Sequence, residues 1–515
     1  MTCTCDLGED SGLNRNVVSP HPTFPAVIRA VFLITLLISG FAFALEPKER
    51  GADDWADEVL YFVVLDRFAD GDPRNNRDVD IKAKGTFHGG DLLGLTQRLD
   101  DLQDLGVTAV WLTPVVKNID HYVDGVGFPD WGYHGYWADD FHKIDDRFGT
   151  EAELKTLVDE AHKRGIKILL DVVYNHAGYG AAYLKQDHAN EWFRTGRRQS
   201  PCGDDPITQC LSGLPDFKTD NDEVVEYLFK AHLGLAKRVG LDGFRLDTVK
   251  HVEHEFWQKH RARADKELGP SFFLLGEVWG GDYKVLDPYF ENDEMDAGFD
   301  FSFAGNVLGF VNGRGRTIAF SRYLLKRHRV RDGFHLAHYL SSHDVPGFLY
   351  QLKGDKTKFK LAAALKFTSA GIPTIYYGEE VGRLGGDWPD NRSDMPWGDR
   401  PIPPGKGLPR DEAMYAYYRK LIQIRKQHPV LALGDYQELH TDGELLVFAR
   451  HAAAGKTVIV AVNRGAEPLE VTVPFPKGLS EGPLKDLLGD APVASSAAGV
   501  QLVVGGQAVQ IIARP

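Results

Sequence analysis

Cysteine is scarce in this chain of 515 residues: only four are present, and two of them, Cys3 and Cys5, lie at the extreme N-terminus. A fold held together by many disulfides is therefore excluded. Short-period repeats and low-complexity tracts are also absent. Since apolar residues make up 43% of the chain and charged residues 26%, the composition is that of globular domains and not of a disordered, collagen-like or coiled-coil protein.

Positive charge is in deficit as well. Lys and Arg total 59 against 73 Asp and Glu, which gives a formal net charge of −14. An acidic chain binds nucleic acid poorly, because such binding depends on clustered cations that displace counterions from phosphate. We therefore expect no nucleic-acid partner and favour a neutral or cationic small molecule.

The longest apolar run lies within the first fifty residues. Residues 27–44 read VIRAVFLITLLISGFAFA, with Arg29 near the start and a small-x-small sequence at the end. This pattern predicts a signal peptide within residues 1–44, and the polar residues 1–26 indicate a start site assigned too far upstream. We expect a secreted or periplasmic protein with no stable membrane association after cleavage. An uncleaved anchor is the alternative, although the run is short for a bilayer-spanning helix.

The two other cysteines, Cys202 and Cys210, lie eight positions apart in the segment CGDDPITQC. In an exported protein, a single close pair favours a disulfide that clips a loop. A metal-binding pair is the alternative, but no third or fourth soft ligand lies nearby in the sequence.

Short apolar runs alternate with longer helical patterns from Trp55 onward. Runs without polar alternation indicate strands buried on both faces, as in a parallel sheet. Eight such strands with intervening helices predict an α/β fold, a (β/α)8 TIM barrel whose chemistry lies at the C-terminal ends of the strands. An open doubly wound sheet is the alternative, but Asp66-Arg67-Phe68 after the first strand is not a glycine-rich phosphate turn. The predicted strands are 60–65, 109–112, 166–173, 243–246, 272–275, 297–301, 336–340 and 374–377.

Two parts of the chain depart from this alternation. Residues 177–220 are rich in Gly, Asp, Pro and Tyr, which predicts a loop-rich domain inserted after the third strand. After Pro429 the helical pattern stops, and short strands over 445–450, 457–463, 469–473 and 500–513 predict a C-terminal antiparallel β-sandwich over 429–515. The barrel itself is expected over 45–176 and 221–428.

Carboxylates follow three of the predicted strands at the same rim of the barrel. Asp247 follows the fourth strand, Glu277 the fifth and Asp344 the seventh. One such acid could be a helix cap or an ion-pair partner, but three at equivalent positions are difficult to explain by stability. Clustered carboxylates repel one another, so at least one pKa rises and a proton donor is distinguished from an ionised nucleophile. Glycoside hydrolysis requires such a pair.

Four segments that contain these residues resemble, in order, the signature regions of the α-amylase family, glycoside hydrolase family 13. They read DVVYNH, GFRLDTVKH, GEVW and LSSHD, and LPDF at residues 214–217 resembles a fifth region. The resemblance covers nearly all of residues 55–515. It implies retaining hydrolysis of internal α-1,4-glucosidic bonds in starch-type glucans and maltooligosaccharides, with an α-glucan as the partner and the chain as a monomer.

The same resemblance implies a role for each matched residue. Asp247 would be the nucleophile, Glu277 the general acid and then the base, and Asp344 would bind hydroxyls of the sugar at the cleavage site. Cyclodextrin-producing relatives carry an acid four positions before Arg392, where this chain carries Trp388. The residues implied to bind substrate are His134, Tyr136, His176, Arg245, Lys250, His251, His343 and Arg392, with Tyr136 as a stacking platform and Arg245 orienting Asp247.

One or two structural calcium ions are expected. Asp70, Asp72, Asn75 and Asn76 offer four side-chain oxygens within seven positions, which suits a hard cation, although Asp and Asn also favour metal-free turns. The resemblance implies one ion bound by these residues together with Asp91 and the Gly89 carbonyl. It implies a second ion bound by Asn175, Asp216 and the His251 carbonyl.

Three features favour an α-amylase-type endo-hydrolase within the family. The barrel pattern begins almost directly after the apolar run, and no length remains for starch-binding domains after the sandwich. Ser212 stands where cyclodextrin-forming relatives carry an aromatic residue. The alternatives are a cyclomaltodextrinase, neopullulanase, maltogenic amylase or transglycosylase of the same family, and a non-catalytic glucan-binding or transporter-associated protein on the same fold.

Overall fold

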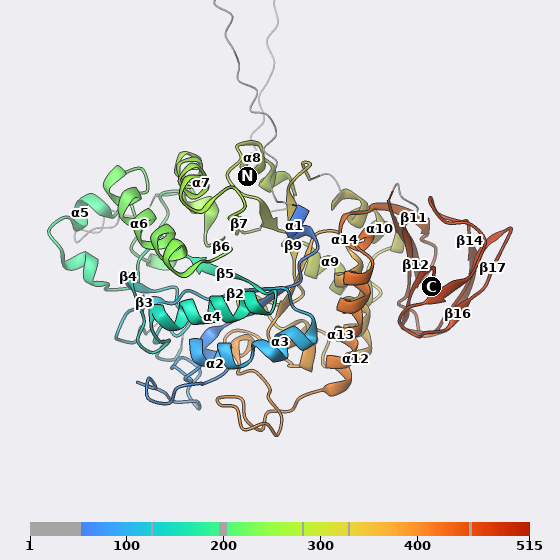
Figure 1. Cartoon of the computed structure of the whole chain (residues 1–515), viewed down its shortest axis with the longest axis horizontal. Coiled ribbons are helices and arrows are strands. Elements are labelled where there is room, and N and C mark those ends of the chain that lie inside the picture. The colour runs from blue at the N-terminus through green and yellow to red at the C-terminus, as the bar shows by residue number, and fades with distance from the viewer. Residues whose placement is uncertain (1–52, 125–126, 195–202, 281–282, 328–329, 453–455) are drawn as a thin grey trace, which may run out of the picture. The chain divides into compact units, whose positions relative to one another are not determined.

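The computed structural model describes residues 53–124, 127–194, 203–280, 283–327, 330–452 and 456–515 (Figure 1). The predicted signal peptide and Cys202 lie outside the described residues, so the signal and the disulfide to Cys210 stay predictions. Across the described residues, no helix combines the length and the apolar character that a membrane crossing needs.

Within the described residues, eight parallel strands close into a barrel in the order β1-β10-β9-β8-β7-β6-β5-β2. Each strand is buried along nearly its whole length, because its side chains face either the barrel interior or the surrounding helices. The TIM-barrel prediction is confirmed, since every predicted strand is present with slightly different ends. The strands are β1 (Leu60–Val63), β2 (Ala109–Leu112), β5 (Lys167–Val172), β6 (Gly243–Leu246), β7 (Phe273–Gly276), β8 (Ala297–Phe299), β9 (His335–His338) and β10 (Ile372–Tyr376).

Helices that follow the strands cover the outside of the barrel. Helix α4 (Glu151–Lys163) begins at a capping box, in which the Thr150 hydroxyl accepts from the Glu153 amide and the Glu153 carboxylate accepts from the Thr150 amide. The other helices are α1 (Asp53–Ala56), α2 (Leu92–Gln97), α3 (Leu99–Leu105), α6 (Asp222–Val239), α7 (His254–Leu268), α8 (Tyr283–Glu291), α9 (Phe303–Val311), α10 (Thr317–Lys326), α11 (Phe348–Gln351), α12 (Lys356–Thr368), α13 (Glu412–Gln427) and α14 (Val430–Leu433).

Two excursions extend from the C-terminal ends of the strands. The first contains a small antiparallel pair, β3 (Val116–Asn118) and β4 (Ala138–Ile144). The second, between β5 and α6, is rich in loops and contains α5 (Ala189–Trp192) and short helical turns. Isolated bridges join His176 to Asp216 and Phe193 to Phe217. Because of these bridges, the far end of the excursion returns to the rim beside the end of β5.

The C-terminal part forms two antiparallel sheets, with the orders β11-β12-β13-β19-β15-β16 and β14-β18-β17 among the described residues. The single strand predicted over 500–513 is wrong: Gly505 and Gly506 separate β18 from β19, and the two strands belong to different sheets. The strands are β11 (Asp435–His440), β12 (Leu445–His451), β13 (Thr457–Asn463), β14 (Leu469–Val473), β15 (Leu484–Asp486), β16 (Pro492–Val493), β17 (Ser495–Ser496), β18 (Gly499–Val504) and β19 (Ala508–Ala513).

Strand β12 is buried on both faces, although antiparallel strands commonly expose one. Leu445 and Val447 pack into the core between the two C-terminal sheets. The alternate residues Leu446 and Phe448 pack into the large core that includes the barrel and its helices. One strand therefore contributes to two cores.

Candidate active site

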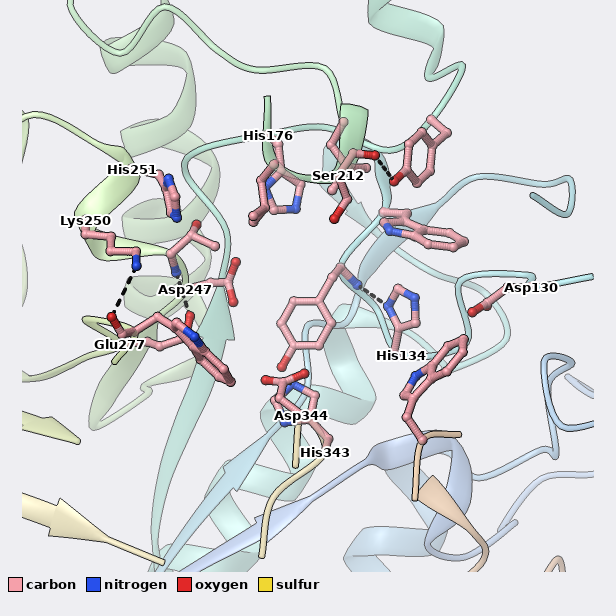
Figure 2. Close-up of a pocket in the computed structure, with 18 of the residues that line it drawn as sticks. Asp130, His134, His176, Ser212, Asp247, Lys250, His251, Glu277, His343 and Asp344 are labelled. Atoms are coloured by element: carbon pink, nitrogen blue, oxygen red, sulfur yellow. Dashed lines mark hydrogen bonds and ion pairs between the residues drawn. The ribbon is translucent and has the colours of Figure 1, made fainter. Parts of the chain in front are cut away.

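A cavity of about 540 Å³ opens at the C-terminal ends of the barrel strands (Figure 2). Asp247 and Glu277 follow the last residues of β6 and β7, and Asp344 lies in the loop after β9. All three carboxylates line the cavity. The predicted substrate-binding residues that also line it are His134, Tyr136, His176, Lys250, His251, His343 and Arg392.

Arg245 is the buried cation that joins the carboxylates of neighbouring strands. Its Nη1 donates to Asp247 Oδ1 at 2.6 Å and to Asp171 Oδ1 at 3.0 Å. Its Nη2 forms an ion pair with Glu277 Oε1 at 2.7 Å. The second oxygen of Glu277 accepts from the Thr248 amide at 2.9 Å. One guanidinium therefore holds Asp247 and Glu277 together, and both carboxylates have a fixed orientation.

The electrostatics of the cavity favour a protonated Glu277. Burial raises the pKa of Glu277 to about 8, and the neighbouring charges of Asp247 and Asp344 act in the same direction. Arg245 opposes this rise but does not cancel it. A carboxylic acid that stays neutral near pH 7 can donate a proton.

Asp344 has the opposite character. Its side chain keeps 31% of its surface exposed to the open cleft, and it lies 3.2 Å from both His343 Nε2 and Arg392 Nη2. Desolvation would raise its pKa, but the adjacent His343 imidazole and the charges of Arg392 and Arg245 hold the pKa of Asp344 below its ordinary value. Asp344 is therefore an ionised acceptor that faces the cavity.

Tyr136 presents a fixed aromatic ring to the cavity. Its hydroxyl donates to Asp171 Oδ2 at 2.7 Å, its backbone amide donates to His134 Nδ1 at 3.1 Å, and its ring stacks on His343 at 5.3 Å. Burial also lowers the pKa values of His134, His176 and His343, the last to about 3. These histidines are neutral at pH 7, so each can donate and accept hydrogen bonds to hydroxyl groups.

Asp171 is a residue that the sequence analysis missed. Its carboxylate accepts hydrogen bonds from Arg245, from Tyr136 and, at 2.9 Å, from Trp111 Nε1. It is the first residue of the segment DVVYNH and directly follows the apolar residues 168–170 of β5. A buried acid in such a strand requires partners, which was the available signal.

The cavity has two distinct ends. Figure 2 shows Glu277 and Lys250 at one side and His134 and Asp130 at the other, with Asp344 between them. The loop-rich excursion supplies Ser212 and other residues of one wall. The lining residues that the sequence analysis did not assign are Asp130, Trp137, Tyr179, Gln209, Leu211, Leu214, Thr248, Trp279 and Trp388.

At one of the two predicted calcium sites, three oxygen atoms that can only accept hydrogen bonds lie close together. The amide oxygen of Asn175 faces Asp216 Oδ1 and the His251 carbonyl oxygen. The Asn175 amide could donate to these two oxygens, at 3.0 and 2.9 Å, only if its oxygen and nitrogen exchanged places. Three converging oxygens without a donor among them are what a hard cation requires. The residues fit calcium.

The other predicted calcium site is partly formed. Asp70, Asn75 and Asn76 each bury a side-chain oxygen that has no hydrogen-bond partner among the described residues. A Cβ at Gly89 would lie 2.7 Å from Asn76 Oδ1, so glycine is needed for the backbone to approach this cluster.

The remaining two predicted ligands of this site already have partners. The carboxylate of Asp72 accepts two hydrogen bonds from Arg74, and Asp91 caps α2 and accepts from the Gly71 amide. In the described part of the chain, no group of three or more His, Cys, Asp or Glu side chains is arranged to hold a metal ion. Each candidate site instead combines a carboxylate, Asp216 or Asp70, with Asn side-chain oxygens and a backbone carbonyl oxygen.

Comparison with known proteins agrees with this geometry. Residues 62–204 and 206–396 match the family model of the α-amylase catalytic domain, and residues 434–512 match that of the α-amylase C-terminal domain. A cyclomaltodextrinase of Geobacillus thermopakistaniensis is 32% identical over 82% of this chain and 72% of that protein. Neopullulanase 2 of Thermoactinomyces vulgaris is 31% identical over 80% of this chain and 70% of that protein.

A solved structure extends the similarity to the fold. The α-amylase of Geobacillus thermoleovorans, crystallised with acarbose, superposes with a TM-score of 0.77 at 31% identity over 89% of this chain and 98% of that chain. The family models, the relatives and the closed barrel agree. The chain therefore belongs to the α-amylase family, glycoside hydrolase family 13, and is a glycoside hydrolase of α-glucans.

Proposed function

We propose that this chain hydrolyses α-1,4-glucosidic bonds of cyclomaltodextrins and short maltooligosaccharides with retention of anomeric configuration. The observation that carries the reaction is the pairing of Asp247 and Glu277 with two nitrogens of the same Arg245 guanidinium. A retaining mechanism needs two carboxyl groups about 5–5.5 Å apart, and a shared guanidinium keeps them close.

In the first step, Asp247 attacks the anomeric carbon while Glu277 transfers its proton to the glycosidic oxygen. The bond between that carbon and that oxygen breaks, the shortened glucan leaves, and a glycosyl ester forms on Asp247. Glu277 carries this proton near pH 7 because its pKa is raised, and Arg245 keeps Asp247 oriented.

In the second step, the ionised Glu277 removes a proton from water, and the oxygen of that water attacks the anomeric carbon. The ester breaks, and Asp247 and the protonated Glu277 are regenerated. Asp344 accepts hydrogen bonds from the hydroxyls of the reacting sugar, and Tyr136 stacks on its ring. These contacts hold the sugar in position during both steps.

The preference for cyclomaltodextrins departs from the endo-acting α-amylase that the sequence analysis favoured. The cyclomaltodextrinase and the neopullulanase support it, because each aligns over about four fifths of this chain. The second candidate is the endo-acting α-amylase itself. It is favoured by the solved α-amylase structure, 98% of which is covered by this chain.

Initial rates on β-cyclodextrin, soluble starch and pullulan distinguish the two candidates. We expect a higher kcat/KM for β-cyclodextrin than for starch when both KM values are expressed as mass concentrations. Proton NMR should show that the first-formed product has the α configuration. A tenfold preference for starch would favour the endo-acting α-amylase. A β-configured first product would contradict the retaining mechanism for both candidates.

We further propose that calcium at the Asn175 cluster attaches the loop-rich excursion to the barrel. Asn175 follows β5, Asp216 lies at the far end of the excursion, and His251 follows β6. Such an ion would stabilise the wall of the cleft without touching the reacting atoms. The apolar run at 27–44 supports export of the protein, which we also propose.

A further inference from the structure

Trp388 is an exposed indole that lines the cavity. It keeps 40% of its surface exposed and stacks on Phe128, with ring centroids 5.3 Å apart and an angle of 29° between the ring planes. A large aromatic ring held by a second ring is preorganised, because little conformational freedom is lost when a ligand packs on it. We propose that Trp388, supported by Phe128, is the stacking platform for an additional glucosyl unit of the substrate.

The chemistry of the carboxylates determines which part of the substrate reaches Trp388. Glu277 protonates the leaving oxygen, so the leaving sugar lies on the side of Glu277 and Lys250. Lys250 donates to the carbonyl of Trp279, a second cavity-lining indole that is 43% exposed. Trp279 therefore belongs to the leaving-group side.

Trp388 belongs to the opposite end of the cleft. Its stacking partner Phe128 lies two residues before Asp130, which Figure 2 places on the side away from Glu277. Arg392, in the same loop as Trp388, donates to the His343 carbonyl at 2.8 Å and to Asp344 at 3.2 Å. The glucosyl unit at Trp388 is therefore on the non-reducing side of the sugar that Asp247 attacks.

The surroundings of Trp388 suit a pyranose ring. A pyranose has an apolar face that packs on an aromatic ring and hydroxyls at its edge that need polar partners. Asp130 is buried and lines the cavity, and its Oδ1 accepts from the Gly132 amide at 3.1 Å. Asp130 and Arg392 thus offer an acceptor and a donor for those hydroxyls. Stacking replaces the side-chain carboxylate that cyclodextrin-producing relatives carry at the position of Trp388.

This inference rests on the proposed function. Two substrates distinguish a failure of the inference from a failure of the proposed function. α-Glucosyl fluoride fills only the sugar site at the carboxylates, whereas α-maltotriosyl fluoride also extends towards Trp388. In Trp388→Ala we expect kcat/KM for the maltotriosyl fluoride to fall at least tenfold, mainly through KM. The value for the glucosyl fluoride should stay within twofold of the wild type, because that substrate does not reach the platform.

Three further variants control the experiment. Trp388→Phe should recover most of the loss, and Phe128→Ala should give a smaller loss in the same direction. Tyr350→Ala, which removes an aromatic ring that is 45% exposed but does not line the cavity, should change neither substrate. A Trp388→Ala variant that affects both fluorides equally, or neither, overturns the inference.

A binding measurement keeps the inference testable if the wild type is inactive. Hydrolysis of neither fluoride by the wild type would contradict the proposed function alone. Calorimetric titration of Glu277→Gln with maltotetraose then decides the inference, since it needs no turnover. Adding Trp388→Ala to this variant should weaken maltotetraose binding about tenfold, and unchanged affinity would overturn the platform.

Discussion

The guanidinium of Arg245 lies 2.7 Å from the carboxylate of Glu277, and yet the pKa of Glu277 is raised to about 8. Arg245 is shared with Asp247 and Asp171, so its charge does not compensate Glu277 alone. Burial and the neighbouring acids therefore determine the protonation state of Glu277.

The first prediction concerns pH. Glu277 must be protonated to donate, and its raised pKa means that the proton is lost as pH rises through about 8. We expect kcat/KM on maltooligosaccharides to fall along an alkaline limb near that pH, because this parameter reports the free enzyme. The residual activity of Glu277→Gln, measured on a glucosyl fluoride that needs no proton, should lack the limb. A limb that persists in this variant would assign it to another group.

The second prediction concerns the nucleophile. Asp247→Asn keeps the shape of the side chain but removes its negative charge, so we expect turnover to fall by about three orders of magnitude or more. The melting temperature should change little, since the amide can still accept from Arg245. Asp187→Asn, an exposed matched change, should leave both quantities unaltered. Parallel losses of activity and stability in Asp247→Asn would show a structural role instead.

The third prediction concerns the stability that Arg245 provides. Arg245→Met removes the cation shared by three buried carboxylates, and breaking one side of a buried ion pair costs about 3–5 kcal/mol. Arg331→Met breaks half-exposed ion pairs with Asp287 and Glu291, which solvent screens, so it should change stability little. Denaturant unfolding of both variants at pH 7 measures the difference. Equal free energies of unfolding for the two variants would mean that Arg245 does not stabilise the three buried acids.

The fourth prediction concerns calcium. Because an ion bound only to the native state stabilises it by mass action, exhaustive chelation should lower the melting temperature, and added calcium should restore it. Asn175→Ala and Asn76→Ala should each reduce this calcium-dependent shift, which assigns it to one cluster or the other. An unchanged melt after metal removal, verified by elemental analysis, would count against both sites.

Local signals in the sequence were sufficient for the barrel and for the acids at its rim. The barrel strands are short and largely apolar, although Asp171 and Arg245 interrupt two of them, and Asp247, Glu277 and Asp344 follow three of the strands. The strand predicted over 500–513 failed because the Gly505-Gly506 pair forms a turn between two apolar segments, where the chain passes from one sheet to the other. Hydrophobicity alone does not detect such a change of sheet.

The contacts that complete the site depend on tertiary structure. The role of Asp171 depends on the hydrogen bonds that it accepts from Arg245 and Tyr136, which come from other parts of the chain. Phe128 and Trp388 are 260 positions apart in the sequence and meet only when two loops fold onto the same rim. Residue type identified the candidates at strand ends, whereas loop residues that lack a motif could be found only from the structure.

The two-sided burial of β12 has a consequence for the integrity of the molecule. Removal of residues 434–515 would expose to water the apolar surface of the barrel core against which Leu446 and Phe448 pack. Exposed surface of that kind promotes aggregation. The C-terminal sheets are therefore an integral part of the catalytic unit, and scanning calorimetry of the whole chain should record a single cooperative transition.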